Sequence, residues 1–160
     1  MNKKLKDVKL VVLDVDGTLT DGGVYIDSNG VESKKFNIKD GAGIVLAEHA
    51  GIEFMILTGR RSFCVEKRAE ELKIKYVSQG VSNKLEYLKN FLLEHDFVSE
   101  QVAYMGDDVN DIECLTYVGF SCCPADAVEE VRSIVDYVSP CNGGKGAVRC
   151  LTDLILKQNV

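Results

Sequence analysis

Leu10-Val11-Val12-Leu13-Asp14-Val15-Asp16-Gly17-Thr18 is the segment that most clearly indicates how this chain folds. Its apolar part is short and continuous, and it stops abruptly at acidic residues and a glycine. Such a run is typical of a β-strand that is buried on both faces. We therefore predict a strand at residues 9–13 inside a parallel sheet, with two carboxylates just beyond its end.

Strand-like runs alternate with helix-like segments along the rest of the chain. Further strands are predicted at residues 53–57, 75–77, 101–105, 119–122 and 135–138, and helices at 40–50, 62–72, 82–95, 127–134, from about 110 and from about 147. Asp40, Ser62 and Ser82 are expected to cap the helices that they begin. This alternation predicts an α/β fold with a doubly wound parallel sheet.

A β-hairpin is predicted near the start of the chain, because Asn29-Gly30 lies between strand-like segments at 24–27 and 32–36. Only about 30 residues separate the first acidic motif from the second strand, and the hairpin and one helix fill them. No cap domain fits there. We expect residues 1–160 to form a single domain with a small hairpin flap at about 24–36.

The composition disfavours several classes of function. The chain has 160 residues, of which 46% are hydrophobic and 28% charged, and its net charge of −6 is unsuited to nonspecific nucleic-acid binding. No apolar run approaches the ~18 residues of a membrane helix, and the apolar stretch after the basic start is too short for a signal peptide. The six cysteines contain no Cys-x-x-Cys pair and are expected to be reduced thiols. We expect a cytoplasmic protein with neither a nucleic-acid nor a membrane partner.

Polar residues that suit phosphate chemistry follow several of the predicted strands. Because ligands bind at the carboxyl ends of parallel strands, these residues should meet at one edge of the sheet. Carboxylates there can hold Mg²⁺, a hydroxyl and an ammonium can hold phosphate oxygens, and a pair of carboxylates can share attack and proton transfer. Each feature alone is weak, since an Asp-x-Asp-Gly is about as often only an acidic turn. The combination comprises Asp14, Asp16, Thr58, Arg60, Lys84, Asp107 and Asp111.

Two other ligand motifs are excluded by spacing. Gly17 falls at the fourth position of the acidic loop, whereas a calcium loop needs glycine at the sixth. The run Gly143–Gly146 is not a P-loop, because no Ser or Thr follows Lys145-Gly146. Its backbone N–H groups are nevertheless able to wrap an anion.

The motifs together resemble those of the haloacid dehalogenase-like phosphatases. Asp14–Thr20 is similar to the first motif of that family, and Thr58, Lys84 and Gly106–Asp111 are similar to the second, third and fourth, in the same order. Further stretches resemble the members that act on an eight-carbon sugar acid phosphate in lipopolysaccharide biosynthesis: residues 21–22, 36–41, 58–61, 79–84 and 143–149. The resemblance thus covers nearly the whole chain.

The resemblance implies a role for each site residue. Asp14 would be the nucleophile that forms an aspartyl-phosphate, and Asp16 would protonate the leaving oxygen and then deprotonate water. Mg²⁺ would be held by Asp14, the backbone carbonyl of Asp16, and Asp107. Thr58 and Lys84 would hold the phosphoryl oxygens, and Asp111 would support Lys84 rather than bind the metal.

Substrate choice and assembly are also implied by the resemblance. Arg60 and Arg68 would pair with the carboxylate of the sugar acid. Arg60 favours the eight-carbon substrate, because a sister enzyme acting on a nine-carbon, sialic-acid-like sugar phosphate typically carries Glu there. With no cap domain, a neighbouring subunit would cover the site, with the hairpins packed in a ring within a homotetramer.

A phospho-receiver signalling module is the main alternative from another functional class. Receivers also gather Asp, Thr and Lys at strand ends of a doubly wound sheet. In this chain, however, Asp107 and Asp111 come after both Thr58 and Lys84, which is the wrong order for a receiver. Turnover of a sugar phosphate would distinguish the two, because a receiver retains its phosphoryl group.

Overall fold

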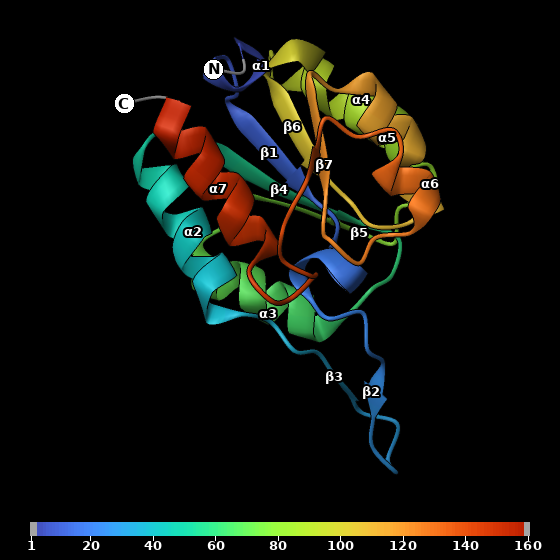
Figure 1. Cartoon of the computed structure of the whole chain (residues 1–160). Coiled ribbons are helices and arrows are strands. Elements are labelled where there is room, and N and C mark those ends of the chain that lie inside the picture. Colours follow the sequence, from blue (N-terminus) through green and yellow to red (C-terminus); the bar gives the residue numbers. More distant parts are fainter. Residues whose placement is uncertain (1–2, 159–160) are drawn as a thin grey trace.

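A six-stranded, all-parallel sheet forms the centre of the computed structural model, which describes residues 3–158 (Figure 1). The strand order is β5-β4-β1-β6-β7-β8, so the chain starts in the middle and winds outward in both directions. This arrangement confirms the predicted doubly wound α/β class. The strands are β1 (Leu10–Leu13), β4 (Glu53–Thr58), β5 (Tyr76–Gln79), β6 (Val102–Met105), β7 (Phe120–Cys123) and β8 (Tyr137–Val138).

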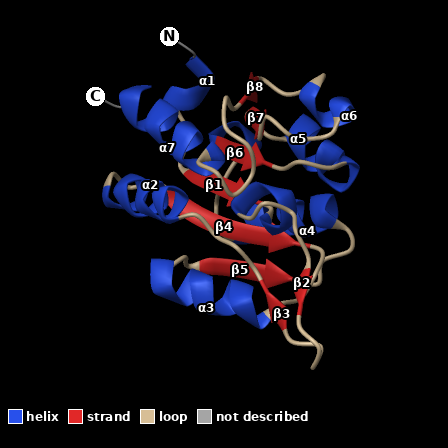
Figure 2. Ribbon diagram, turned by 60° about the horizontal axis from the view of Figure 1, so that its bottom comes forward, coloured by secondary structure: helices blue, strands red, loops and turns tan. Residues whose placement is uncertain are grey.

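Helices cover both faces of the sheet, as Figures 1 and 2 show. One face carries α1 (Lys3–Lys6), α2 (Ile38–His49), α3 (Phe63–Leu72) and α7 (Ala147–Gln158). The other face carries α4 (Lys84–Glu94), α5 (Ile112–Tyr117) and α6 (Glu129–Arg132). Short 3₁₀ turns at Ser99–Gln101 and Val109–Asp111 precede β6 and α5. Within residues 3–158, no helix is long and apolar enough to cross a bilayer.

Successive residues of β1 point into two separate apolar cores. Val11 and Leu13 pack under α2 and α7, whereas Leu10 and Val12 pack under α4, and all four are completely buried. Burial of both faces removes the need for polar residues in the strand, which explains its continuous apolar run. In the parallel register Leu13 lies beside Ile56 of β4 and Met105 of β6. β1 and β6 therefore end at the same level, and β4 continues two residues further, to Thr58.

The predicted hairpin is present and extends away from the sheet domain (Figure 1). Its strands are only β2 (Tyr25–Ile26) and β3 (Glu32–Ser33), joined through a turn in which Gly30 has a φ of +79°. That positive φ explains the glycine of the Asn-Gly signal. The hairpin leaves apolar side chains in solvent, among them Ile26, which is 62% exposed.

Two of the predicted helix caps are wrong, and the third, Ser62, stands at the N-cap position of α3 but its side chain makes no capping hydrogen bond. Asn37, not Asp40, caps α2 by accepting from the Lys39 N–H, so the helix begins earlier than predicted. Asn83, not Ser82, caps α4 by accepting from the Glu86 N–H. Both asparagines satisfy N–H groups that have no partner within the helix, as any good N-cap residue can. The start of each helix therefore contains two residues of a type that can cap it, and the local sequence pattern does not distinguish between them.

Asp40 instead binds the start of a different helix. Its carboxylate is buried and accepts from the backbone N–H of Gly146 at 3.3 Å and of Arg149 at 2.8 Å. Burial raises the pKa of this carboxyl group, and the backbone N–H groups act in the opposite direction. Asp40 thus joins α2 to the first turn of α7, where a negative charge is also favoured by the helix dipole.

The glycine run at 143–146 does not offer a free anion-binding loop, so that expectation is wrong. The N–H of Gly143 donates to Asp126, that of Gly144 to the carbonyl of Thr18, and that of Gly146 to Asp40. A side chain at Gly143 would overlap the backbone at Gly17. The run is therefore a support that packs closely under the turn that follows β1.

Replacing Asp40 tests this support. We expect Asp40→Ala to lower the free energy of unfolding by about 2–3 kcal/mol, because two buried N–H groups lose their acceptor. Urea unfolding followed by circular dichroism measures the change. The control is Asp153→Ala, which removes a surface pair with Arg149 on the same helix and should cost less than about 1 kcal/mol. Equal losses in the two variants would contradict the assignment.

Candidate active site

A small cleft opens where β1, β4 and β6 end. Its volume is about 150 Å³, and its lining comprises Asp14, Asp16, Thr58, Gly59, Arg60, Asp107, Asp108 and Asn110. These residues come from three segments that are far apart in the sequence, and the aligned strand ends bring them together. Five of the predicted site residues line this cleft: Asp14, Asp16, Thr58, Arg60 and Asp107.

The turn after β1 is shaped by Gly17 and Thr20. Gly17 has a φ of +87°, and a side chain at this position would overlap the Asp107 carboxylate. The Thr20 hydroxyl accepts from the N–H groups of Gly17 and Gly22 and donates to the carbonyl of Val15. The turn therefore packs Gly17 directly against the Asp107 carboxylate, and only glycine permits this close approach.

Lys84 lies beside Asp14, although it belongs to a different element. It is the first residue of α4, and its ammonium is 3.0 Å from Asp14 Oδ1 and 2.8 Å from Asp111 Oδ1. The Lys84 side chain is only 3% exposed. Burial opposes its charge, but the carboxylates of Asp14 and Asp111 outweigh burial, and the pKa of Lys84 is raised. Lys84 is therefore a charged anchor that lies behind Asp14, although it does not itself line the cleft.

Asp111 accepts hydrogen bonds from several groups around Asp14, Lys84 and Asp107, which together form the charged corner of the site. It is completely buried, and its Oδ1 accepts from Lys84 at 2.8 Å and from the Tyr104 hydroxyl at 2.7 Å. Its Oδ2 accepts from the backbone N–H groups of Asp107 at 3.2 Å and Asp108 at 3.5 Å. Asp111 thus orients both the ammonium of Lys84 and the loop that carries Asp107.

Three carboxylates at this corner are close enough to share an ion. Oxygen atoms of Asp14, Asp107 and Asp111 all lie within 4.8 Å of one another. Burial raises the pKa of Asp14 to about 6 and that of Asp107 to about 8, and repulsion from neighbouring carboxylates adds to both shifts. A divalent cation bound by oxygen would relieve this repulsion, and Mg²⁺ prefers such ligands. The donor set therefore fits Mg²⁺.

The hairpin contributes charged residues that the sequence analysis missed. Lys34 contacts the Asp16 carboxylate, and its side chain is only 2% exposed. Glu32 lies 3.5 Å from Lys34 and 2.6 Å from Arg60, whose other nitrogen is 3.7 Å from Asp16. Positive and negative groups thus alternate at the mouth of the cleft. A charged residue in an exposed hairpin is ordinary in sequence, so no local signal distinguished Lys34.

Arg68 is not brought into the cleft. Its guanidinium pairs with Glu71 at 2.7 Å, donates to the carbonyl of Asn37 at 3.3 Å and lies over the ring of Phe36. These contacts keep it between α2 and α3. Spacing placed Arg68 two turns into α3 but could not predict the direction in which its side chain points.

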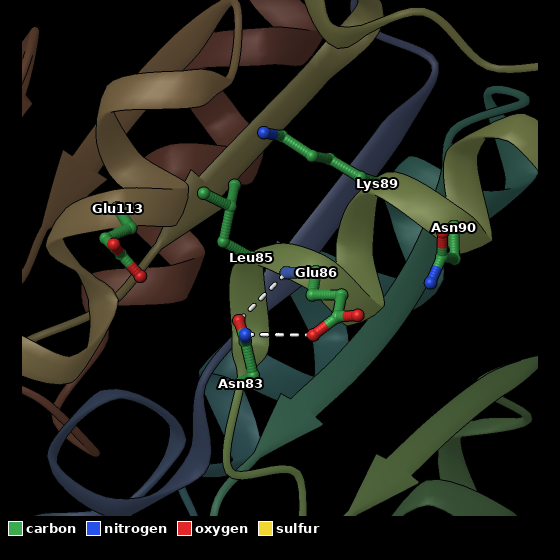
Figure 3. Close-up of a pocket in the computed structure, with 6 residues that line it drawn as sticks. All are labelled: Asn83, Leu85, Glu86, Lys89, Asn90 and Glu113. Carbon is green, nitrogen blue, oxygen red and sulfur yellow. Dashed lines mark hydrogen bonds between the residues drawn. The ribbon is translucent and has the colours of Figure 1, made fainter.

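A larger depression of about 310 Å³ lies beside α4 (Figure 3). It is lined by Asn83, Leu85, Glu86, Lys89, Asn90 and Glu113. The hydrogen bonds drawn there join Asn83 to Glu86 and belong to the cap of α4. The clustered acidic groups with raised pKa values, Asp14 and Asp107, lie instead in the smaller cleft, which we take as the candidate active site.

Known sequences resemble this chain along nearly its whole length. A family model described as haloacid dehalogenase-like hydrolase matches residues 77–151. The 3-deoxy-D-manno-octulosonate 8-phosphate phosphatase of Escherichia coli (strain K12) is 43% identical over 153 residues, which cover 96% of this chain and 81% of the relative. The enzyme of the same name from Haemophilus influenzae is 38% identical over 157 residues, covering 98% and 87%.

Solved structures of related proteins have the same fold as this chain. The 3-deoxy-D-manno-octulosonate 8-phosphate phosphatase of Moraxella catarrhalis, in complex with magnesium ion, phosphate ion and KDO, superimposes with a TM-score of 0.95 at 38% identity, covering 98% of this chain and 90% of the other. A cobalt-bound phosphatase from Haemophilus influenzae gives a TM-score of 0.94 at 38% identity, covering 98% and 92%.

The raised pKa values predict how stability depends on pH. Asp14 and Asp107 keep their protons to a higher pH in the folded chain than in the unfolded one. With a chelator present, the free energy of unfolding should therefore fall as the pH rises from 5 to 8. Added Mg²⁺ should reverse this fall, because it stabilises the ionised carboxylates.

Urea unfolding at several pH values, with EDTA or with Mg²⁺, measures this dependence. Asp107→Asn is the matched variant, and its stability in EDTA should vary less with pH. If the free energy of unfolding of the wild-type protein instead rises between pH 5 and 8 in EDTA, the pKa values of Asp14 and Asp107 are not raised in the folded chain.

Proposed function

Because this chain belongs to the haloacid dehalogenase-like 3-deoxy-D-manno-octulosonate 8-phosphate phosphatases, we propose that it removes phosphate from that eight-carbon sugar acid phosphate. One observation carries the proposal: the Asp14 carboxylate lies within 4.8 Å of a second acidic group, Asp107, and 3.0 Å from the buried ammonium of Lys84. The proposed nucleophile Asp14, a carboxylate that can help to hold Mg²⁺ and an ammonium that can hold phosphate thus lie close together in one site. Membership of this family also argues against the phospho-receiver alternative.

The reaction that we propose has two displacement steps. In the first step, an Asp14 oxygen attacks phosphorus and the bond from phosphorus to the sugar oxygen breaks, which leaves an aspartyl-phosphate on Asp14. In the second step, water attacks that phosphorus and releases inorganic phosphate and the free Asp14 carboxylate. Splitting hydrolysis in this way replaces one difficult step by two easier ones.

Asp16 is the proposed proton carrier of both steps. It lines the cleft two residues after Asp14 and would give its proton to the departing sugar oxygen. It would then take a proton from the attacking water, which restores its starting state. The contacts of Asp16 with Lys34 and Arg60 hold its carboxylate in the lining of the cleft, where it would face the departing sugar oxygen.

Thr58 and Lys84 are proposed to hold the phosphoryl oxygens, while Asp111 keeps Lys84 in place. Mg²⁺ would be held by Asp14, the backbone carbonyl of Asp16, and Asp107. When bound, it supplies positive charge that offsets the repulsion between the attacking carboxylate and the phosphate. Together with Lys84 it makes the cleft suitable for an anionic ester despite the acidic surroundings.

Substrate recognition is proposed to depend on Arg60. The cleft of about 150 Å³ is smaller than the ~300–1,000 Å³ of sites that enclose a whole small molecule. It therefore accommodates the phosphoryl end, and the sugar must extend past the mouth, where Arg60 is 48% exposed. A guanidinium there can pair with the carboxylate of the sugar acid. Arg68 is left out of this proposal, because its contacts hold it elsewhere.

A phosphate-release assay tests the proposed function. Asp14→Asn should lower turnover of 3-deoxy-D-manno-octulosonate 8-phosphate by about a thousandfold or more, because the amide cannot form the acyl-phosphate bond. Omitting Mg²⁺ should have a comparable effect. Asp153→Asn, on the surface of α7, is the control and should keep full activity. Undiminished release by Asp14→Asn would overturn the mechanism, and faster turnover of the nine-carbon sugar acid phosphate would overturn the role of Arg60.

We propose that this phosphatase works as a homotetramer. The hairpin exposes Val24, Ile26 and Val31, which are 59%, 62% and 59% accessible, and clustered apolar side chains of this kind mark contact surfaces. The cleft is open to solvent in the single chain, whereas phosphoryl transfer benefits from the exclusion of water. Hairpins packed together in a ring would cover both the apolar side chains and the mouth of the cleft. Residues 1–160 would then act as one domain in each subunit.

Sedimentation velocity tests the assembly. Ile26→Lys should shift the protein from tetramer to smaller species and lower its activity, because a buried ammonium in the hairpin contact is unfavourable. Leu93→Lys is the matched control, since Leu93 is 81% exposed on α4; it should remain tetrameric. A fully active wild-type monomer would refute the proposal.

The cellular setting is part of the same proposal. The six cysteines, at positions 64, 114, 122, 123, 141 and 150, are all free thiols, which agrees with a reducing compartment. We place the enzyme in the cytoplasm, with a small-molecule sugar acid phosphate as its substrate and lipopolysaccharide biosynthesis as the use of its product.

A further inference from the structure

We propose that Tyr104 determines which carboxylates can bind the metal ion. Its hydroxyl occupies the last free acceptor position of Asp111 and so keeps this carboxylate out of the coordination sphere. The result is a site with two carboxylate ligands, Asp14 and Asp107, which suits Mg²⁺ better than Ca²⁺. This inference rests on the proposed function, since that function supplies the metal.

The acceptor capacity of Asp111 is completely used. An ionised carboxylate offers about four lone-pair positions, two on each oxygen. Lys84 and Tyr104 donate to Oδ1, and the N–H groups of Asp107 and Asp108 donate to Oδ2. A cation can therefore bind Asp111 only if one of these donors is displaced.

Distance alone does not exclude Asp111 from the metal site. Its oxygen lies within 4.8 Å of oxygens of Asp14 and Asp107, so all three carboxylates could surround one ion. A side chain at Gly106 would overlap the Asp111 carboxylate, which shows how closely the loop wraps it. Asp14 and Asp107 line the cleft, whereas Asp111 is completely buried and does not. Burial and hydrogen bonding, rather than distance, thus distinguish Asp111 from the two proposed ligands.

Tyr104 is the donor best suited to this role. Two of the other donors are backbone N–H groups, and Lys84 also serves Asp14. Tyr104 is completely buried in β6, and it packs in the core cluster that contains Leu88 and Cys114. A hydroxyl on a ring fixed in this way holds a constant direction toward Oδ1.

Releasing Asp111 should change the choice of metal. Ca²⁺ takes 6–8 oxygen ligands at longer distances, whereas Mg²⁺ demands a compact octahedron and keeps several waters. A third carboxylate with a free lone pair adds ligands and charge, which benefits Ca²⁺ more. Without the Tyr104 hydroxyl, the preference of the site should therefore move toward Ca²⁺.

Calorimetric titration of the substrate-free protein with Mg²⁺ alone and with Ca²⁺ alone tests the inference. Tyr104→Phe keeps the ring and removes only the hydroxyl. We expect its ratio of dissociation constants, Ca²⁺ over Mg²⁺, to fall about fivefold or more relative to wild type. The matched control is Tyr117→Phe, because Tyr117 packs on the same cluster while its ring faces Lys89; its ratio should not change.

Other outcomes contradict the inference. If Tyr104 only stabilises the core, Tyr104→Phe will weaken both metals equally or neither, and the ratio will stay constant. Adding Asp111→Asn to Tyr104→Phe should restore the wild-type ratio, because the amide removes the released charge; a ratio that stays low would also overturn the inference. Thermal unfolding followed by circular dichroism checks the fold of each variant.

The same titrations separate this inference from the proposed function. A wild-type protein that binds no Mg²⁺ and releases no phosphate would refute the proposed function itself. A wild-type protein that binds Mg²⁺ and hydrolyses the sugar acid phosphate, together with an unchanged ratio in Tyr104→Phe, would refute only the role of Tyr104.

Discussion

The paired contacts of Lys84 with Asp14 and Asp111 are the interaction on which the rest of the site depends. A buried ammonium is stable only when carboxylates compensate its charge. Here one ammonium faces three carboxylates, because Asp107 belongs to the same corner. Burial and the excess negative charge together raise the pKa of Asp107, and the excess charge favours a divalent cation. With that cation bound, the corner accepts a phosphoryl group that the carboxylates alone would repel.

This corner requires close packing of backbone as well as charge. Side chains at Gly17 and Gly106 would overlap the carboxylates of Asp107 and Asp111, and a side chain at Gly143 would overlap the backbone of Gly17. The glycines let three loops meet behind the cleft. Asp40 then secures the outermost loop by binding the first turn of α7. The support of the site thus extends to α2 and α7, on one face of the sheet.

The hairpin connects the site with the proposed assembly. Its apolar residues face solvent, while Glu32 and Lys34 turn inward to Arg60 and Asp16. A contact that moves the hairpin would therefore move the charged groups around the proposed proton carrier. This arrangement gives a physical reason why assembly and activity should change together in a hairpin variant.

The strands, the doubly wound sheet and the meeting of Asp14, Thr58 and Asp107 at one edge could be predicted from the chain alone. Apolar periodicity is a local signal for strands, and parallel strands of one sheet present their carboxyl ends at the same edge. The partners of side chains whose contacts lie far along the chain became known only from the folded arrangement. Asp40 binds a backbone group 109 residues away, and Lys34 reaches Asp16 across 18 residues. Tyr104 looked like an ordinary core residue, and Arg68 turned away from the cleft. Such contacts depend on how separate segments pack against one another, and residue spacing within one segment cannot predict that packing.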